Sequence, residues 1–182
     1  MKRGILSILL LLTCGFASAQ EKHKAQSAYD FLQSIGVNSA IYRRGESVER
    51  TIECINYIGA RWIRTDESMN TDEQVAAIKR LHDAPGVKIS TSLGSGGSDI
   101  EALIQGSRCM AAMGALLAIE GNNEPNNWGI RYKGQEGGRD KSWVAVARLH
   151  RDLYQAVKQD EVLRHYPVWA TTESGAMTDN VG

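Results

Sequence analysis

The sequence has few cysteines and none of the spacings that bind metal ions. Of its three cysteines, Cys14 lies in the N-terminal segment, whereas Cys54 and Cys109 lie in segments with helical periodicity. One disulfide between Cys54 and Cys109, or two buried thiols, fits this arrangement equally well. The four histidines are scattered, and no His/Cys cluster has ligand spacing. We therefore expect no metal site.

An excess of charge of either sign is also missing. The 182-residue chain has 21 basic and 21 acidic residues. Without residues 1–19, which hold two basic and no acidic residues, 19 basic and 21 acidic residues remain, and the formal charge is −2. Such a balanced chain has no electrostatic footprint for nucleic acid. We therefore expect no nucleic-acid partner.

Long apolar runs are missing beyond the N-terminus. Two basic residues precede an apolar run at 4–12, which is too short to cross a bilayer as a helix. The sequence Ala-Ser-Ala at 17–19 supplies the small residues that signal peptidase requires. These features predict a signal peptide over residues 1–19. We expect the mature protein to be secreted or periplasmic, with no membrane contact after cleavage.

From residue 36 onward, short apolar runs typical of strands alternate with amphipathic runs typical of helices. Strict alternation with short connections predicts a parallel sheet covered by helices. The strands are expected at 36–41, 61–66, 87–93, 115–119 and 168–172. The helices are expected after the cap residue Ser47, after a capping box of Thr71 and Gln74, after the cap residue Ser98, and over 143–159.

Two architectures fit this alternation: an open doubly wound sheet and a (β/α)8 barrel of the TIM type. Arg64 and Asp66 end the second predicted strand, a Gly/Ser loop at 94–98 follows the third, an Asn/Glu cluster follows the fourth, and Glu173 follows the fifth. Barrel active sites are built at these carboxyl ends, although open sheets also bind ligands there. The interpretation is an α/β fold of the (β/α)8 TIM-barrel type, incomplete, with about five βα units in residues 20–182.

The most informative stretch lies at 119–128 and reads IEGNNEPNNW. Pro125 cannot donate a ladder hydrogen bond, so the fourth strand has to end before it and presents Glu124 at the rim. Glycoside hydrolysis needs a carboxylic acid that protonates the leaving oxygen, and a second carboxylate across the sugar. We expect Glu124 to be that acid. The residues expected to bind sugar hydroxyls or to stack on a sugar ring are Asn123, Asn127 and Trp128.

Asn-Glu-Pro after a fourth strand resembles the acid/base signature of the clan A retaining glycoside hydrolases, the cellulase-like and β-xylosidase-like barrels. The resemblance implies that Glu124 is the proton donor and that Asn123 binds the sugar 2-hydroxyl. The clan also places an Arg near the end of strand two, which Arg64 matches more loosely. Its nucleophile is a second Glu after strand seven, which is expected beyond residue 182. No cofactor is required, and the expected partner is an oligo- or polysaccharide.

Other charged residues near these strand ends have less direct roles. Glu120 shares a face with Glu124 if the strand stays extended and is the alternative candidate for the acid. It lies deeper, however, and we expect buried donors to hold it in support of the site. Arg64 and Asp66 form a structural ion pair or contact sugar hydroxyls, with the ion pair favoured. Glu173 binds substrate or is an exposed loop acid. It is rejected as nucleophile, because carboxylates on adjacent strands, about 4.8 Å apart, would lie side by side.

The Gly/Ser loop at 94–98 leads into a helix, a geometry that binds phosphate through backbone N–H groups. It lacks the Lys-Ser/Thr ending of a P-loop and the dinucleotide spacing, so a flexible rim loop is favoured. Tyr132 and Trp143 extend a sugar platform or fill the core. The favoured function is an exported retaining glycoside hydrolase. Two alternatives stay open: a non-catalytic carbohydrate-binding barrel, and an open-sheet α/β enzyme with a phosphate ligand.

Overall fold

The computed structural model describes residues 25–41, 46–65, 69 and 71–175. The predicted signal peptide at 1–19 and the predicted supporting residue Asp66 lie outside these residues. Among the described residues, no helix has the length and apolar character needed to cross a membrane. The same residues contain no group of three or more His, Cys, Asp or Glu side chains that could hold a metal ion.

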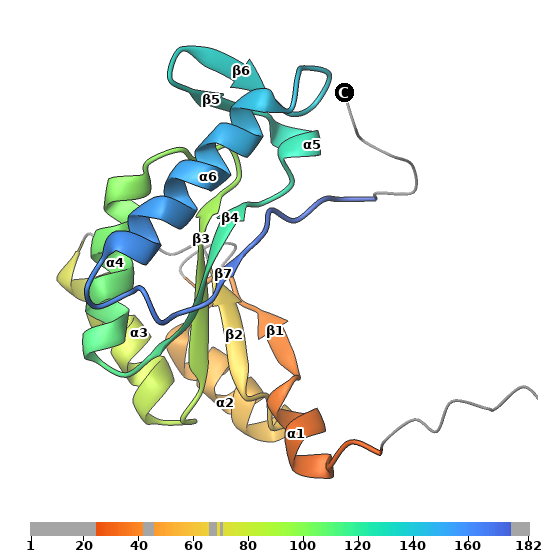
Figure 1. The fold of residues 1–182 in the computed structure, drawn as a ribbon. Coiled ribbons are helices and arrows are strands. Elements are labelled where there is room, and N and C mark those ends of the chain that lie inside the picture. Colours follow the sequence, from red (N-terminus) through yellow and green to blue (C-terminus); the bar gives the residue numbers. More distant parts are fainter. Residues whose placement is uncertain (1–24, 42–45, 66–68, 70, 176–182) are drawn as a thin grey trace, which may run out of the picture.

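The centre of the protein is a five-stranded sheet in which every pairing is parallel (Figure 1). The strand order follows the chain, so the sheet contains no point at which the winding reverses. A parallel α/β architecture is therefore confirmed. In order, the strands are β1 (Gly36–Asn38), β2 (Trp62–Thr65), β3 (Lys88–Gly94), β4 (Leu116–Asn122) and β7 (Val168–Trp169).

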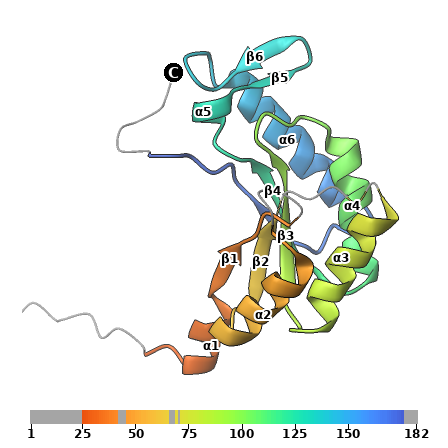
Figure 2. The same cartoon turned by 180° about the vertical axis from the view of Figure 1, so that it is seen from behind.

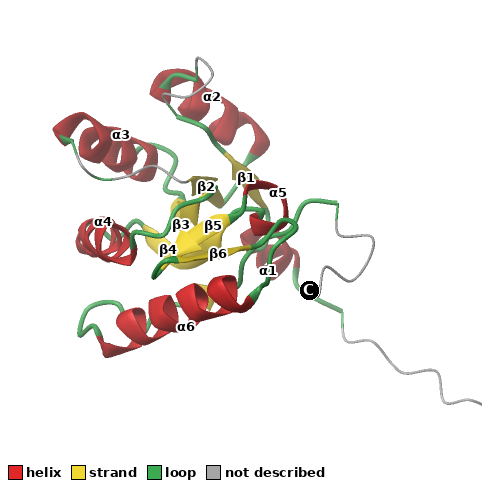
Figure 3. Ribbon diagram, turned by 90° about the horizontal axis from the view of Figure 1, so that it is seen from above, coloured by secondary structure: helices red, strands yellow, loops and turns green. Residues whose placement is uncertain are grey.

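Four helices form an arc around one side of the sheet, as the view from above shows (Figure 3). Figure 2 presents the same arrangement from behind. Winding in one direction keeps every connection on the same face, because each βα crossover is right-handed. These helices are α2 (Val48–Ile58), α3 (Asp72–Asp83), α4 (Ile100–Ala112) and α6 (Val144–Gln159).

Local capping signals set where the helices begin. The Ser47 side chain accepts a hydrogen bond from the backbone of α2, and Thr71 with Gln74 forms the predicted capping box of α3. The predicted cap of α4 was wrong by one residue: Asp99, not Ser98, accepts from the backbone N of Ala102 at 3.0 Å. Both residue types are strong caps, and the carboxylate at Asp99 reaches the first turn.

The main hydrophobic core lies between the sheet and the helices. Alternate strand residues such as Ile63, Ile89 and Ile119 point into it and are fully buried. The residues between them point to the other face of the sheet, where Ser90 and Glu120 are buried polar residues. The sheet therefore has an apolar face against the helices and a polar face opposite.

The polar face of the sheet is concave. The rings of Trp62 on β2 and Trp169 on β7 meet edge to face with centroids 5.7 Å apart. In the register of the sheet, Trp62 on β2 pairs with Lys88 on β3. Trp169 on β7 pairs with Glu120 on β4, and Glu120 pairs with Ser92 on β3. On a flat sheet the two tryptophans would be separated by about 14 Å across the strands and about 13 Å along them. The ring contact therefore requires a sheet that twists and curves toward this side.

The segment between β4 and α6, for which the sequence predicted no regular element, is structured. This segment contains a one-turn helix, α5 (Pro125–Trp128), and an antiparallel hairpin of β5 (Ile130–Tyr132) and β6 (Gln135–Gly137). A second small core of Ile130, Ala145, Val146 and Leu149 holds the hairpin on α6. The short helix α1 (Ala28–Gln33), which buries none of its residues, was also not predicted.

Neither prediction for the cysteines is confirmed. Cys54 and Cys109 are both free, Cys54 is exposed, and Cys109 is partly buried. Helical periodicity places both residues on helices, but it does not bring the two sulfur atoms together, because Cys54 lies on α2 and Cys109 on α4. The core therefore stabilises the protein without a disulfide between these residues.

Candidate functional site

Segments from three strands meet where the polar face of the sheet ends. The backbone N of Asn123 donates to the carbonyl oxygen of Gly94 at 3.1 Å, and the backbone N of Glu124 donates to that of Thr172 at 2.9 Å. Thr172 in turn donates its backbone N–H to Asn122 at 3.1 Å. These bonds place Glu124 at the rim formed by the carboxyl ends of β3, β4 and β7, as predicted from the position of Pro125.

The backbone of Glu124 adopts the left-handed conformation, with φ 50° and ψ 56°. This conformation costs a residue with a Cβ roughly 1 kcal/mol or more. It ends the extended run of β4 and starts α5 at Pro125, and the carbonyl of Glu124 accepts the backbone N–H groups of Asn127 and Trp128 at 2.8 and 3.0 Å. Glu124 therefore does not continue the alternation that would have placed it on the face of Glu120.

The side chain of Glu124 is partly exposed and accepts a hydrogen bond from the Asn127 amide at 3.1 Å. Asn127 was predicted to bind substrate, but its described contact orients the Glu124 carboxylate. Asn126 of the same turn exchanges hydrogen bonds with the backbone of Ser174, at 2.7 and 3.2 Å. This pair of bonds fixes α5 to the segment that follows β7.

Glu120 is buried on the polar face, with 3 % of its surface exposed. Its carboxylate accepts hydrogen bonds from Arg64 Nε at 2.7 Å and from Ser90 Oγ at 2.6 Å. The Arg64 side chain is 20 % exposed, so the ion pair reaches from the interior to the rim. The prediction that buried donors hold Glu120 is confirmed. The described acidic partner of Arg64 is Glu120, whereas the predicted partner Asp66 lies outside the described residues.

Asn123 has its amide fixed from three directions. Its Oδ1 accepts from Arg64 Nη1 at 3.1 Å and from Thr172 Oγ1 at 3.2 Å, and its Nδ2 donates to Ser95 Oγ at 3.0 Å. Arg64 Nη2 also donates to Thr172 Oγ1 at 3.4 Å. A primary amide has two N–H donors, so one N–H of Asn123 is available to a ligand. Thr172 and Ser95 were not predicted as site residues.

The Gly/Ser loop after β3 packs against this network. A Cβ at Gly97 would lie 1.9 Å from the carbonyl oxygen of Leu93, so this tight approach requires glycine. Asn122 donates its amide to the carbonyl oxygen of Gly97. The Asp99 carboxylate occupies the N-terminus of α4, where a phosphate would otherwise bind. These contacts support a loop held at the rim, and they disfavour the alternative of a phosphate site.

Two other predicted site residues lie at the same rim. Glu173 follows Thr172 and is exposed. Trp128 ends α5 with 62 % of its surface exposed, which suits a ring that stacks on a ligand. Trp128 also lines a pocket of about 390 Å3 between α5, the hairpin and residues 137–141. Glu124 is not among the residues that line this pocket.

Tyr132 and Trp143 serve the small second core instead of a sugar platform. Both pack against the cluster that joins the hairpin to α6, and the Tyr132 hydroxyl donates to Asp152 at 2.9 Å. Burial and the neighbouring Asp152 carboxylate raise the pKa of Tyr132. Hydrogen bonds from Lys133, Arg151 and Tyr132 hold the pKa of Asp152 far below its usual value. The charges on this side of the hairpin are therefore engaged with one another.

No protein-family model matches the chain, and no curated protein matches it. A function for this site is therefore argued from its geometry. The geometry presents one carboxylate at a strand-end rim, an oriented amide beside it, and an exposed indole one turn away.

Proposed function

We propose that the protein is an exported retaining glycoside hydrolase in which Glu124 is the catalytic acid/base. The observation that carries the proposal is the position of Glu124 beside Asn123, at the rim formed by three parallel strands. Asn123 is oriented by Arg64 and Thr172, and its remaining N–H can donate to a sugar hydroxyl next to the reacting carbon. The sequence of residues 1–19 supports export.

A (β/α)8 barrel is the architecture that we propose for this site. The strands follow chain order, the four long helices α2, α3, α4 and α6 lie on one face, and buried polar residues lie on the other. Arg64 pairs in register with Ser90 and Ser90 with Ala118, whereas the ion pair joins Arg64 to Glu120. Arg64 thus contacts a residue two positions beyond its in-register partner Ala118, two strands away. A barrel with eight strands and a shear of 8 has a stagger of one residue per strand, which is the same offset.

In the proposed reaction Glu124 donates its proton to the glycosidic oxygen as the bond to the anomeric carbon breaks. A second carboxylate attacks that carbon and forms a glycosyl-enzyme, and Glu124 then takes a proton from the water that releases the sugar. Among the described carboxylates, Glu120 is engaged by Arg64 and Ser90, and Glu173 follows the strand adjacent to β4. We therefore propose that the nucleophile comes from outside the described residues.

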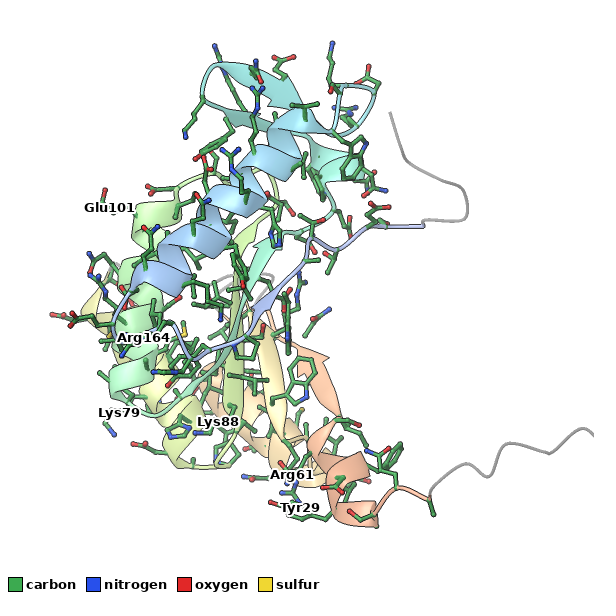
Figure 4. All side chains as sticks on the ribbon, in the orientation of Figure 1. Tyr29, Arg61, Lys79, Lys88, Glu101 and Arg164 are labelled. Carbon is green, nitrogen blue, oxygen red and sulfur yellow. The ribbon has the colours of Figure 1, made fainter. Side chains whose placement is uncertain are left out.

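The test replaces Glu124 with Gln and measures turnover of glycosides with poor and good leaving groups. General acid catalysis contributes about 10²- to 10⁴-fold, so we expect a loss of this size with poor leaving groups. Azide should restore turnover with good leaving groups. The matched control is Glu101→Gln, because Glu101 lies on α4, on the helix side of the sheet (Figure 4). Equal activity of both variants would refute the role of Glu124.

A second candidate is a non-catalytic carbohydrate-binding protein with the same residues at the rim. The observation in its favour is that Glu120 is engaged by Arg64 and Ser90, and that Glu173 follows the strand adjacent to β4, so neither is placed as a nucleophile opposite Glu124. A wild-type protein that binds oligosaccharides but turns over none of them, under conditions in which a known glycosidase is active, would favour this candidate. Catalytic turnover that depends on Glu124 would exclude it.

A further inference from the structure

The pocket beside α5 is built directly on the residue that follows Glu124. The carbonyl oxygen of Pro125 accepts the backbone N–H groups of Gly129 at 3.0 Å and Arg139 at 2.8 Å. A Cβ at Gly138 would lie 2.2 Å from this oxygen, so the close approach requires glycine. The pocket wall is therefore tied through the backbone of Pro125 to the residue that follows the candidate acid.

The form of the pocket suits a sugar residue. Its volume of about 390 Å3 lies at the lower end of the range of small-molecule sites. Several of its lining residues are glycines, among them Gly129, Gly137 and Gly138, whose backbone polar groups border the pocket. The exposed indole of Trp128 borders it and offers an apolar face. An aromatic face next to backbone and side-chain polar groups is an arrangement that binds a ring with hydroxyl groups.

The charges of the pocket are unpaired, in contrast to those on the other side of the same hairpin. Lys133 and Arg151 both contact Asp152. In the pocket, no described residue forms a hydrogen bond or ion pair with the charged groups of the lining side chains. These side chains are Arg131, Glu136, Arg139, Asp140 and Lys141.

The unpaired charges leave a cationic excess near Pro125. Arg131 and Glu136 are direct partners in the register of the hairpin, so their charges offset each other. Of the other three, Arg139 and Lys141 are basic and Asp140 is acidic. The backbone of Arg139 is fixed by its bond to Pro125 and has φ 55°, a conformation that a non-glycine residue keeps only under constraint. These constraints fix the backbone of Arg139 at the pocket, and its exposed guanidinium can bind carboxylate or sulfate oxygens with two parallel hydrogen bonds.

We propose that this pocket binds the anionic group of an acidic saccharide, with Arg139 and Lys141 as the cationic contacts and Trp128 as the stacking surface. The anionic group is the carboxylate of a uronic acid or a sulfate ester. This inference rests on the proposed glycosidase function. Under that function, the substrate is a polysaccharide that contains uronate or sulfated sugars. The acidic sugar unit in the pocket is then adjacent, in the polysaccharide, to the sugar unit whose glycosidic bond is cleaved.

The test is a binding measurement on the full chain that does not depend on turnover. Calorimetric titration compares a glucuronate-containing oligosaccharide, a sulfated oligosaccharide and a neutral glucose oligosaccharide of the same length. Arg139 and Lys141 are exposed, and an exposed ion pair of this kind predicts up to about fivefold tighter binding of an acidic ligand for each contact. Arg139→Gln and Lys141→Gln should each remove most of this preference, with circular dichroism as the check on folding. The matched control is Arg148→Gln, because Arg148 contacts Gln135 outside the pocket lining.

The outcomes separate the two proposals. Preference for the uronate or for the sulfate alone supports the inference and identifies the anionic group, and preference for both supports a general anion site. Equal affinity for acidic and neutral ligands, or a preference that both pocket variants retain, overturns it. If Glu124→Gln keeps full activity while Arg139→Gln loses the preference, the proposed catalysis fails and the binding pocket stands. If glycosidase activity depends on Glu124 but the protein shows no preference for acidic ligands, the proposed catalysis stands and the binding pocket fails.

Discussion

The buried ion pair between Arg64 and Glu120 allows a quantitative test of the site geometry. Arg64→Met removes the guanidinium but retains an unbranched side chain that fills much of the same space. Ser90 is then the one described donor to Glu120. Removing one partner of a buried pair costs about 3–5 kcal/mol. Because the Arg64 side chain is 20 % exposed and Ser90 still donates, we expect the lower end of this range, a loss of about 3 kcal/mol in the free energy of unfolding.

Urea denaturation at neutral pH, followed by tryptophan fluorescence, measures this loss. The matched control is Arg80→Met, because Arg80 contacts Glu49 at 2.8 Å with both side chains more than half exposed. An exposed pair is worth at most about 1 kcal/mol. Adding Glu120→Gln to Arg64→Met should recover part of the loss, because no unpaired charge then remains in the interior. Similar losses in the Arg64 and Arg80 variants, or full additivity in the double variant, would refute the buried coupling.

Two further predictions concern the C-terminal end of α6 and the glycines near the hairpin. Burial alone would raise the pKa of Asp160, but hydrogen bonds from the backbone of the following turn and from Arg108 outweigh it and hold the pKa below its usual 3.8. The carboxylate therefore contributes stability at pH values above 3.8, and this contribution is lost as the pH falls through the lower folded-state pKa. In urea denaturation, the difference between wild type and Asp160→Asn should shrink as the pH falls from about 5 to below 3.8; a growing difference would contradict this. In thermal denaturation, Gly134→Ala, with φ 78° and open space around it, should cost roughly 1 kcal/mol. Gly138→Ala should cost about 1–3 kcal/mol more, because its Cβ would meet Pro125, and equal costs would show that the close approach is not rigid.

The helices could be predicted because their signals are local. The apolar spacing after Ser47 gives α2, and Thr71 with Gln74 gives the start of α3. The start of α4 was missed by one residue because Ser98 and Asp99 are both good caps, and only the geometry of the turn decides between them. The parallel sheet followed from the alternation of elements, since parallel strands need a crossover between them.

The hairpin could not be predicted from apolar periodicity, because each of its strands has only three residues. Its stability comes from contacts with α6, which are distant in the sequence. A signal was nevertheless present at Lys133-Gly134. Both residues have positive φ, 48° and 78°, as a two-residue hairpin turn of the I′ type requires, and glycine at its second position is typical.

The candidate site was predicted in part. Glu124 and Asn123 stand out because Pro125 ends a strand directly after them. Thr172 and Ser95 were missed because a single hydroxyl residue in a loop carries no pattern of its own. The ion pair of Arg64 joins residues 56 positions apart in the chain, and their contact depends on strand register and sheet curvature, which composition and spacing do not reveal.

Side chains along β4 point alternately to the two faces of the sheet, so neighbouring residues have different roles. Ile119 packs among the helices, while Glu120 belongs to the polar network on the opposite side. A substitution at Ile119 should therefore act through lost packing alone. A substitution at Glu120 should also release Arg64, which holds the amide of Asn123 at the rim. A change deep in the sheet can thus alter the site without contacting a ligand.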